Sequence, residues 1–299
     1  MTATAARAPS IGLATLLVSL SAIGFGLVPW FAKGLLAAGL DSAAVAFYRF
    51  LLAGIVLLPF LALAPEKRAA TLWAVATGAA VALGWIGYVE ALKVAPVATV
   101  GVIYMTYPLF TLMIAWAWQR LKPSPRALGG GVLVLAAATL ALAPALLLPD
   151  ALGPLLLAFA APITFGFGIT ILTTKLLALS AVERASGFFV GAVLGLLPLV
   201  ASLDSSQLIP AAAGDWLLIV GIAIVTSLLP NVAYAYAAPF IGPGRTAMAG
   251  SIELPTMFAL AWLAFGEALT WPQLIAGALV VVAIVITPAV RPVSSHPAP

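Results

Sequence analysis

The feature that most restricts the fold of this chain is a series of apolar stretches long enough to cross a lipid bilayer. A transmembrane helix needs about 20 consecutive, mainly apolar residues. Only 7% of the 299 residues are charged, whereas a soluble domain has about 25%. We therefore predict an all-α integral membrane protein with ten transmembrane helices, at Ser10–Ala32, Ser42–Leu63, Thr71–Leu92, Val97–Trp118, Arg126–Ala143, Leu152–Thr174, Ala185–Ser202, Asp215–Ala238, Gly244–Phe265 and Pro272–Val290.

The basic residues predict the orientation of these helices. Cytoplasmic loops of membrane proteins carry an excess of Lys and Arg. If the N-terminus is cytoplasmic, only Lys33 and Lys93 fall outside, and Arg49 lies within a helix. The remaining ten basic residues then fall inside: Arg7, Lys67, Arg68, Arg120, Lys122, Arg126, Lys175, Arg184, Arg245 and Arg291. This bias places both termini in the cytoplasm. It also accounts for the pI near 9.6 without a nucleic-acid partner.

The chain also contains an internal repeat. Three pairs of prolines share one separation, 147 residues (255 − 108), which is close to half of the chain: Pro96 with Pro243, Pro108 with Pro255, and Pro125 with Pro272. We predict a five-helix repeat in residues 1–148, a second in residues 149–290, and a disordered cytoplasmic tail at 291–299. Because five is an odd number, the second repeat is expected to be inverted relative to the first, as in many secondary transporters.

The available residue types argue against an enzyme. The chain has no Cys, its single His296 lies in the predicted tail, and Glu90 and Glu253 fall at different depths, so no catalytic group or metal-ligand set is expected. No cofactor is expected either, and the phosphate-binding G-x-x-x-x-G-K-[ST] motif is absent. A channel remains an alternative, although channels usually need a filter or a ring of subunits. An internal inverted repeat supplies its own pathway, so a monomer suffices, and the oligomeric state is left open.

Several motifs are shared with a known family. They are Glu253-Leu254-Pro255, Gly266-Glu267 and Leu274–Leu279 in the second repeat, and Tyr107-Pro108, Leu128-Gly129-Gly130 and Arg49 in the first. With these motifs, residues 10–290 resemble the EamA-type transporters of the drug/metabolite transporter superfamily. The first repeat departs from the pattern at Gln119-Arg120, where the second has Gly-Glu. The resemblance implies an exporter of small metabolites. More narrowly, the chain resembles the YddG-type bacterial amino-acid exporters, which handle aromatic and other neutral amino acids.

Two charged residues within the predicted helices are candidates for substrate binding. Glu253 lies near the middle of its helix, where an ionisable group by default marks a functional site. It can bind a substrate ammonium group, carry a proton, or be a buried carboxyl bonded to a neighbouring helix. Arg49 can bind a substrate carboxylate, or it can hold helices together or reach to the interface. A pair between Arg49 and Glu90 is a further possibility, since both lie in the outer half.

Prolines and aromatic residues complete the candidate site. Pro108 and Pro255 cannot donate a hydrogen bond to the carbonyl four residues back, that of Tyr104 and Ser251 respectively, and we expect both prolines to act as hinges beside the pathway. The alternative is that they are simple packing kinks. The other candidates for substrate contact are Trp85, Tyr88, Tyr107 and Asn231.

Together with the apolar helices, the family resemblance implies a multi-pass exporter in the bacterial inner membrane. Its substrates would be amino acids, including aromatic and other neutral ones, moved by alternating access through a cavity between the repeats. The partners expected are this small-molecule substrate and the lipid bilayer. An exporter of other metabolites or drugs in the same superfamily is the alternative.

Overall fold

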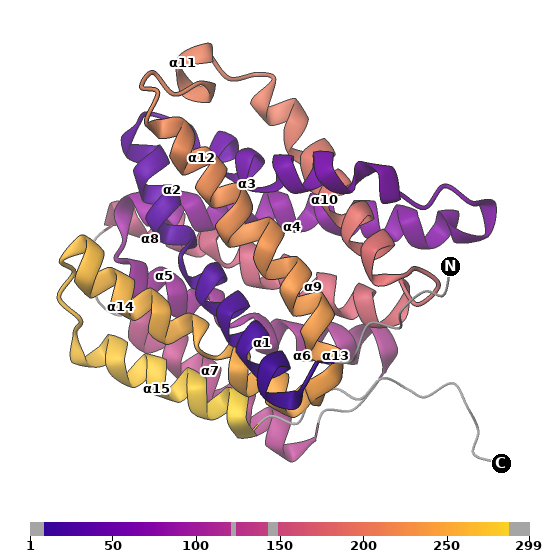
Figure 1. Ribbon diagram of the computed structural model, residues 1–299. Helices are drawn as coiled ribbons and strands as arrows, with labels where there is room; N and C mark the ends of the chain where they lie inside the picture. Colours follow the sequence, from indigo (N-terminus) through magenta and orange to yellow (C-terminus); the bar gives the residue numbers. More distant parts are fainter. Residues whose placement is uncertain (1–8, 121–123, 143–148, 287–299) are drawn as a thin grey trace.

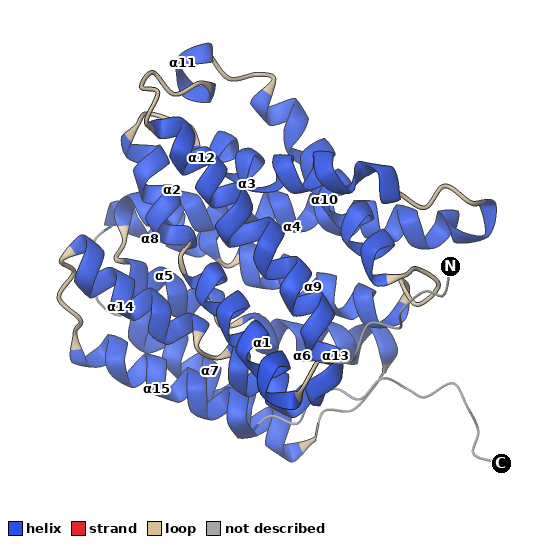
Figure 2. Cartoon of the chain, in the orientation of Figure 1, coloured by secondary structure: helices blue, strands red, loops and turns tan. Residues whose placement is uncertain are grey.

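The computed structural model describes residues 9–120, 124–142 and 149–286, and all regular structure in that part of the chain is helical (Figures 1 and 2). The longer helices are α1 (Ile11–Gly26), α2 (Val28–Ala37), α3 (Ser42–Leu57), α4 (Arg68–Val94), α5 (Val97–Tyr104), α6 (Tyr107–Gln119), α7 (Pro125–Leu142), α8 (Pro149–Ala158), α9 (Ala160–Thr174), α10 (Ala181–Val200), α12 (Asp215–Ala223), α13 (Leu229–Gly250), α14 (Glu253–Phe265) and α15 (Trp271–Ile286). The short ones are the 3₁₀ turns η1 (Leu58–Phe60) and η2 (Pro65–Lys67), α11 (Ser205–Leu208) and the π-helical turn η4 (Ile224–Leu228).

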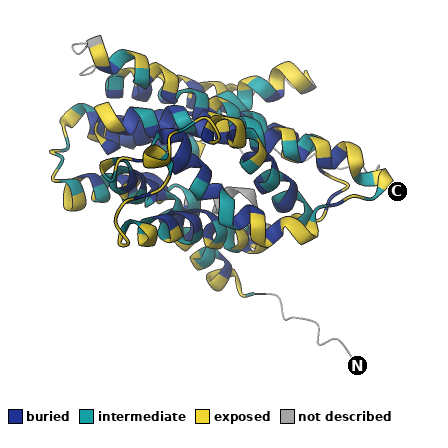
Figure 3. Cartoon of the chain, turned by 90° about the horizontal axis from the view of Figure 1, so that it is seen from above, coloured by how far each residue is buried: buried dark blue, intermediate teal, exposed yellow. Residues whose placement is uncertain are grey.

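Helices that can cross a membrane account for most of the described chain. Eight helical segments are long and apolar enough to do so, and α14 and α15 are shorter apolar helices. Large apolar side chains on these segments face outward, among them Leu217 and Leu263, which are 74% and 72% exposed. Figure 3 shows buried residues in the middle of the bundle and exposed ones around its rim. In a bilayer this outward apolar surface contacts lipid tails, so the structure supports the prediction of a multi-pass membrane protein.

Prolines interrupt four of the predicted transmembrane helices. The breaks lie at Leu27 before Pro29, at Met105–Thr106 before Pro108, at Phe159 before Pro162, and at Ser251–Ile252 before Pro255. Proline has no amide donor, and its ring clashes with the carbonyl four residues back. The interruptions at Pro108 and Pro255 are therefore confirmed. Those at Pro29 and Pro162 have the same cause, although the sequence analysis treated these two helices as continuous.

The Gly242-Pro243-Gly244 segment does not break the helix, which corrects one prediction. The ninth transmembrane helix was expected to begin at Gly244, but α13 runs unbroken through this segment and ends at Gly250. Glycine and proline lower helix propensity but do not forbid a helix, and tertiary context often overrides local propensity.

Helices of the two halves pack in a two-fold pattern. Helix α1 of the first half packs on α13 of the second half, and α9 of the second half packs on α4 of the first half. The later helices pair like with like, α5 with α14 and α7 with α15, as Figure 1 also shows. Two copies of one unit related by a two-fold axis produce this exchange of partners.

Polar side chains tie the bundle together near one end of these helices. The ammonium of Lys33 in α2 lies 2.8 Å from Oε1 of Glu267, and the backbone N–H of Val97 donates to Oε2 of Glu267 at 2.8 Å. Nε2 of Gln273 donates to Oγ1 of Thr99 at 3.1 Å. These bonds join α2, the start of α5 and the turn between α14 and α15.

The pairing suggested for Arg49 and Glu90 is wrong in the described residues. Glu90 pairs instead with Lys93, one turn further along the same helix, at 2.7 Å. An ion pair within one exposed helical turn needs no burial of either charge, whereas Arg49 is buried. The predicted tail at 291–299, with His296 and Arg291, lies outside the described residues, as do Arg7 and Lys122.

Glycines let α4 and α10 approach backbone to backbone. A Cβ atom added at Gly78 would overlap the carbonyl oxygen of Phe188, and one added at Gly191 would overlap that of Val75. Small residues at helix contacts are the usual means of close packing in membranes, where lipid tails are as apolar as the side chains. This contact joins the third and seventh predicted helices, and α4 carries part of the candidate site.

We predict that Gly78→Ala lowers the stability of the folded protein by about 1–3 kcal/mol, because the added methyl group meets backbone that must move as a whole. Thermal unfolding in detergent measures the change. Gly129→Ala is the matched control, since a Cβ at Gly129 of α7 meets nothing within 4 Å. Equal midpoints for both variants would show that the close contact of α4 and α10 contributes nothing to stability.

Candidate functional site

Four of the aromatic residues singled out in the sequence form one cluster inside the protein. The ring centroids of Trp85 and Tyr88 in α4 are 4.5 Å apart, and those of Trp85 and Tyr104 in α5 are 5.2 Å apart. Tyr107, at the start of α6, lies 5.8 Å from Tyr104. The two sides of the proline-dependent break therefore contribute one ring each. Edge-on and tilted contacts at these distances are favourable packing for aromatic rings.

Phe165 of α9 closes the cluster from the second half of the chain. Its ring lies 5.1 Å from that of Tyr107 and 5.9 Å from that of Tyr104. The sequence analysis missed this residue. A signal in the sequence is that Phe165 directly precedes Gly166-Phe167-Gly168, where two glycines permit close helix contact. In the structure, a Cβ on Gly166 would lie 2.7 Å from the backbone nitrogen of Thr111 in α6. That close contact brings α9 against α6.

Arg49 of α3 places its positive charge beside this cluster. The central carbon of its guanidinium lies 3.7 Å from the centre of the Trp85 ring, which is a close cation–π contact. Arg49 is only 6% exposed. Its Nε and Nη1 atoms are buried and have no hydrogen-bond partner within the described part of the protein. The hydroxyl of Tyr88, also within electrostatic range of Arg49, is buried and unpaired in the same way.

Glu253 supplies the carboxyl group of the site. It is the first residue of α14, where the positive end of the helix dipole favours a carboxylate, and it is 9% exposed. It lies within electrostatic range of Arg49, Tyr88 and Tyr104. In the described residues, however, its carboxylate has no ion pair within 4.0 Å, so Arg49 and Glu253 are neighbours but not partners.

Tyr234 of α13 is a further member that the sequence analysis missed. It lies within electrostatic range of both Glu253 and Tyr107, and its ring is 6.4 Å from that of Phe25 in α1. A signal for it was its position three residues after Asn231, which places the two side chains on one face of a helix. With Tyr234, helices from both halves surround Glu253.

The other two polar candidates lie at irregular turns. The side-chain amide of Asn231 donates to the backbone carbonyl of Ser227 at 2.7 Å, so it caps the π-helical turn η4. Such turns are frequent at functional sites. A Cβ on Gly24 of α1 would lie 2.7 Å from the carbonyl oxygen of Val225, so η4 packs directly on α1. Ser251 lies half-buried in the turn between α13 and α14, two residues before Glu253.

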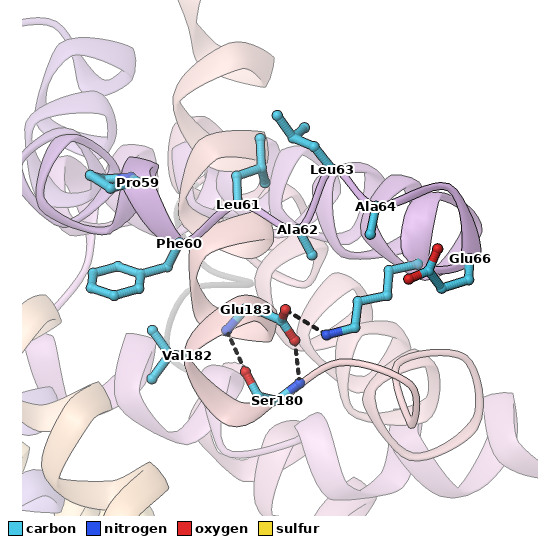
Figure 4. Close-up of a pocket in the computed structure, with 11 residues that line it drawn as sticks. Pro59, Phe60, Leu61, Ala62, Leu63, Ala64, Glu66, Ser180, Val182 and Glu183 are labelled. Carbon is cyan, nitrogen blue, oxygen red and sulfur yellow. Dashed lines mark hydrogen bonds and ion pairs between the residues drawn. The ribbon is translucent and has the colours of Figure 1, made fainter.

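A separate pocket of about 510 Å³ opens between the segment 59–67 and the start of α10 (Figure 4). Ser180 and Glu183 form a capping box there, and Lys67 lies 2.7 Å from Oε1 of Glu183. None of the candidate residues lines it. Two of its three ionic side chains, Lys67 and Glu183, are paired with each other, and it contains none of the buried charges, so we assign the functional site to the interior cluster.

An interior site with one cation, one carboxylate and a wall of aromatic rings, contributed by both halves of a membrane-spanning bundle, is typical of secondary transporters. The sequence model of the EamA-like transporter family matches residues 12–143 and again residues 152–288. The chain belongs to this family and is a multi-pass membrane transporter of small molecules. The double match confirms the family resemblance drawn from the motifs.

The fold is shared with solved structures. One of them, titled "Crystal structure of protein", matches with a TM-score of 0.61 and 16% sequence identity. The match covers 92% of this chain and 96% of the other. At this identity the likeness shows the fold alone. Among curated proteins, none matches this sequence.

We predict that the Arg49–Trp85 contact stabilises the protein measurably. In a double-mutant cycle of Arg49→Met and Trp85→Leu, thermal unfolding should show a coupling of about 1–2 kcal/mol, because the desolvated guanidinium loses its partner ring. Trp116→Leu is the control for loss of a Trp, since Trp116 is 54% exposed on α6. Additive effects of Arg49→Met and Trp85→Leu would contradict the prediction.

Proposed function

We propose that this transporter exports amino acids, including aromatic and other neutral ones, across the bacterial inner membrane with both termini in the cytoplasm. The observation that carries the proposal is the pair of neighbouring ionisable groups Arg49 and Glu253 beside the aromatic cluster, which form no ion pair among the described residues. A neutral amino acid has one charge of each sign and, when aromatic, a side chain that stacks on such rings. In this proposal Glu253 holds the substrate ammonium or exchanges it for a proton.

The proposed mechanism is alternating access. The aromatic rings pack against one another, with Trp85 4% and Tyr104 5% exposed, so a substrate must separate them to bind. Tyr104 and Tyr107 lie on opposite sides of the break before Pro108, and Glu253 directly follows the break before Pro255. A change of angle at these two breaks would open the cluster towards one side of the membrane at a time.

We predict saturable uptake of radiolabelled phenylalanine and leucine into proteoliposomes that contain the purified protein. If Glu253 exchanges substrate for a proton, an imposed pH gradient should raise wild-type flux, and Glu253→Gln should abolish that increase. Glu90→Gln is the control, because it removes a carboxylate that pairs with Lys93 away from the site. Absence of amino-acid flux under every gradient would refute the substrate assignment and favour another metabolite or a drug.

We also predict that Pro108→Ala and Pro255→Ala slow transport while binding affinity is retained. Alanine restores the missing amide donor and favours a continuous helix at each break. A bias of about 1.4 kcal/mol towards the straight form would lower the turnover rate about tenfold. Pro198→Ala is the control, since Pro198 lies within α10 away from these breaks. Unchanged turnover in both folded variants would rule out the hinge role.

A further inference from the structure

We infer that Arg49 and Tyr88 form an anion subsite that requires a free carboxylate on the transported molecule. The inference rests on the proposed function and deepens it, because it states which group of the substrate the positive end of the site recognises. Its basis is a set of buried donors without acceptors: Nε and Nη1 of Arg49 and the hydroxyl of Tyr88.

Unpaired buried donors are rare, and those of a charged group are the least favourable of all. Buried polar groups in folded proteins are nearly always hydrogen-bonded, because a donor removed from water without a partner loses its whole solvation. Here one guanidinium and one phenol in adjacent helices share this condition. We infer that one acceptor from outside the described chain satisfies both when the site is occupied.

The orientation of the guanidinium favours a planar anion. Trp85 covers one face of it, with 3.7 Å between the guanidinium carbon and the ring centre. Hydrogen bonds of a guanidinium lie in its plane, so stacking on a ring leaves the donors at its edge available. A carboxylate matches that planar edge, and charge-assisted bonds to it are the strongest that Arg forms. Stacking also fixes the direction from which the anion must approach.

In the conformation described, Glu253 is not the acceptor for the donors of Arg49. Glu253 lies within electrostatic range of Arg49 but forms no ion pair with it among the described residues. The two charges therefore stand apart, with Tyr88 and Tyr104 within electrostatic range of both. A molecule that bridges them has a carboxylate at the end near Arg49 and a cation at the end near Glu253. This is an α-amino acid with its carboxyl group unmodified.

Binding to purified protein tests the subsite directly. The probes are phenylalanine, phenylalaninamide and 3-phenylpropionate, with quenching of intrinsic fluorescence or a rise in the unfolding midpoint as the readout. The amide keeps the ammonium and the ring but lacks the carboxylate, whereas phenylpropionate lacks only the ammonium. Wild-type protein should bind phenylalanine at least tenfold more tightly than its amide. In Arg49→Gln that preference should fall to about twofold or less.

Three further variants separate the roles within the site. Arg49→Lys keeps the charge without the planar fork and should retain an intermediate preference, and it serves if Arg49→Gln fails to fold. Tyr88→Phe should reduce the preference severalfold. Glu253→Gln should leave the preference for the carboxylate intact. It should lower the affinity for phenylalanine more than the affinity for 3-phenylpropionate. Arg68→Gln, which removes an exposed arginine, is the control and should bind all three probes as wild type does.

The outcomes distinguish this inference from the proposed function. If phenylalanine binds but the amide binds equally well, the subsite is refuted while amino-acid transport stands. The subsite is also refuted, and amino-acid transport stands, if Arg49→Gln and Glu253→Gln lower the affinity for all probes equally. Arg49 would then act only as a countercharge to Glu253. If phenylpropionate binds through Arg49 and phenylalanine does not, the anion subsite stands and the amino-acid assignment fails. If neither carboxylate binds, both are refuted.

Discussion

Inside a bilayer every backbone amide and carbonyl must find its partner within the protein, and the architecture of this transporter depends on that constraint. It makes each interruption of a membrane-spanning helix informative. The chain is broken at Met105–Thr106 and at Ser251–Ile252, where a proline cannot complete the ladder, and both breaks lie beside the candidate site.

The same constraint applies to buried charged side chains, which also need partners within the protein. Arg49 could stack on Trp85 in a purely structural role, but stacking satisfies none of its in-plane donors. Elsewhere in the described bundle three ion pairs are complete: Lys33 with Glu267, Lys67 with Glu183, and Lys93 with Glu90. Among the described residues, Arg49 and Glu253 form no such pair, and this contrast is the basis of the proposal that these two groups bind a substrate.

Much of the candidate site could be predicted because the residues involved are conspicuous in an apolar chain. A carboxylate or guanidinium within a transmembrane stretch is easily recognised, because burying an ionisable group in the bilayer is energetically unfavourable. Tyr104 and Tyr107 lie close to Pro108, which interrupts such a stretch. Phe165 and Tyr234 are less conspicuous. Their positions beside a glycine pair and three residues after Asn231 are weak signals, because an aromatic side chain on an apolar helix does not itself show whether it faces cavity, core or lipid. The suggested pair of Arg49 with Glu90 failed because sequence places residues by depth but not by the direction in which they face.

The sequence by itself determined the class of fold and its two-fold plan. Apolar length, the bias of basic residues and the repeated proline spacing act along the chain, and each can be read without knowing which helices touch. Only the tertiary structure decided which groups are partners. Whether Glu253 meets Arg49, and whether the donors of Arg49 are satisfied, depends on helix rotation and close glycine contacts such as that of Gly78 with α10. Those are set by packing between distant segments, which local sequence does not encode.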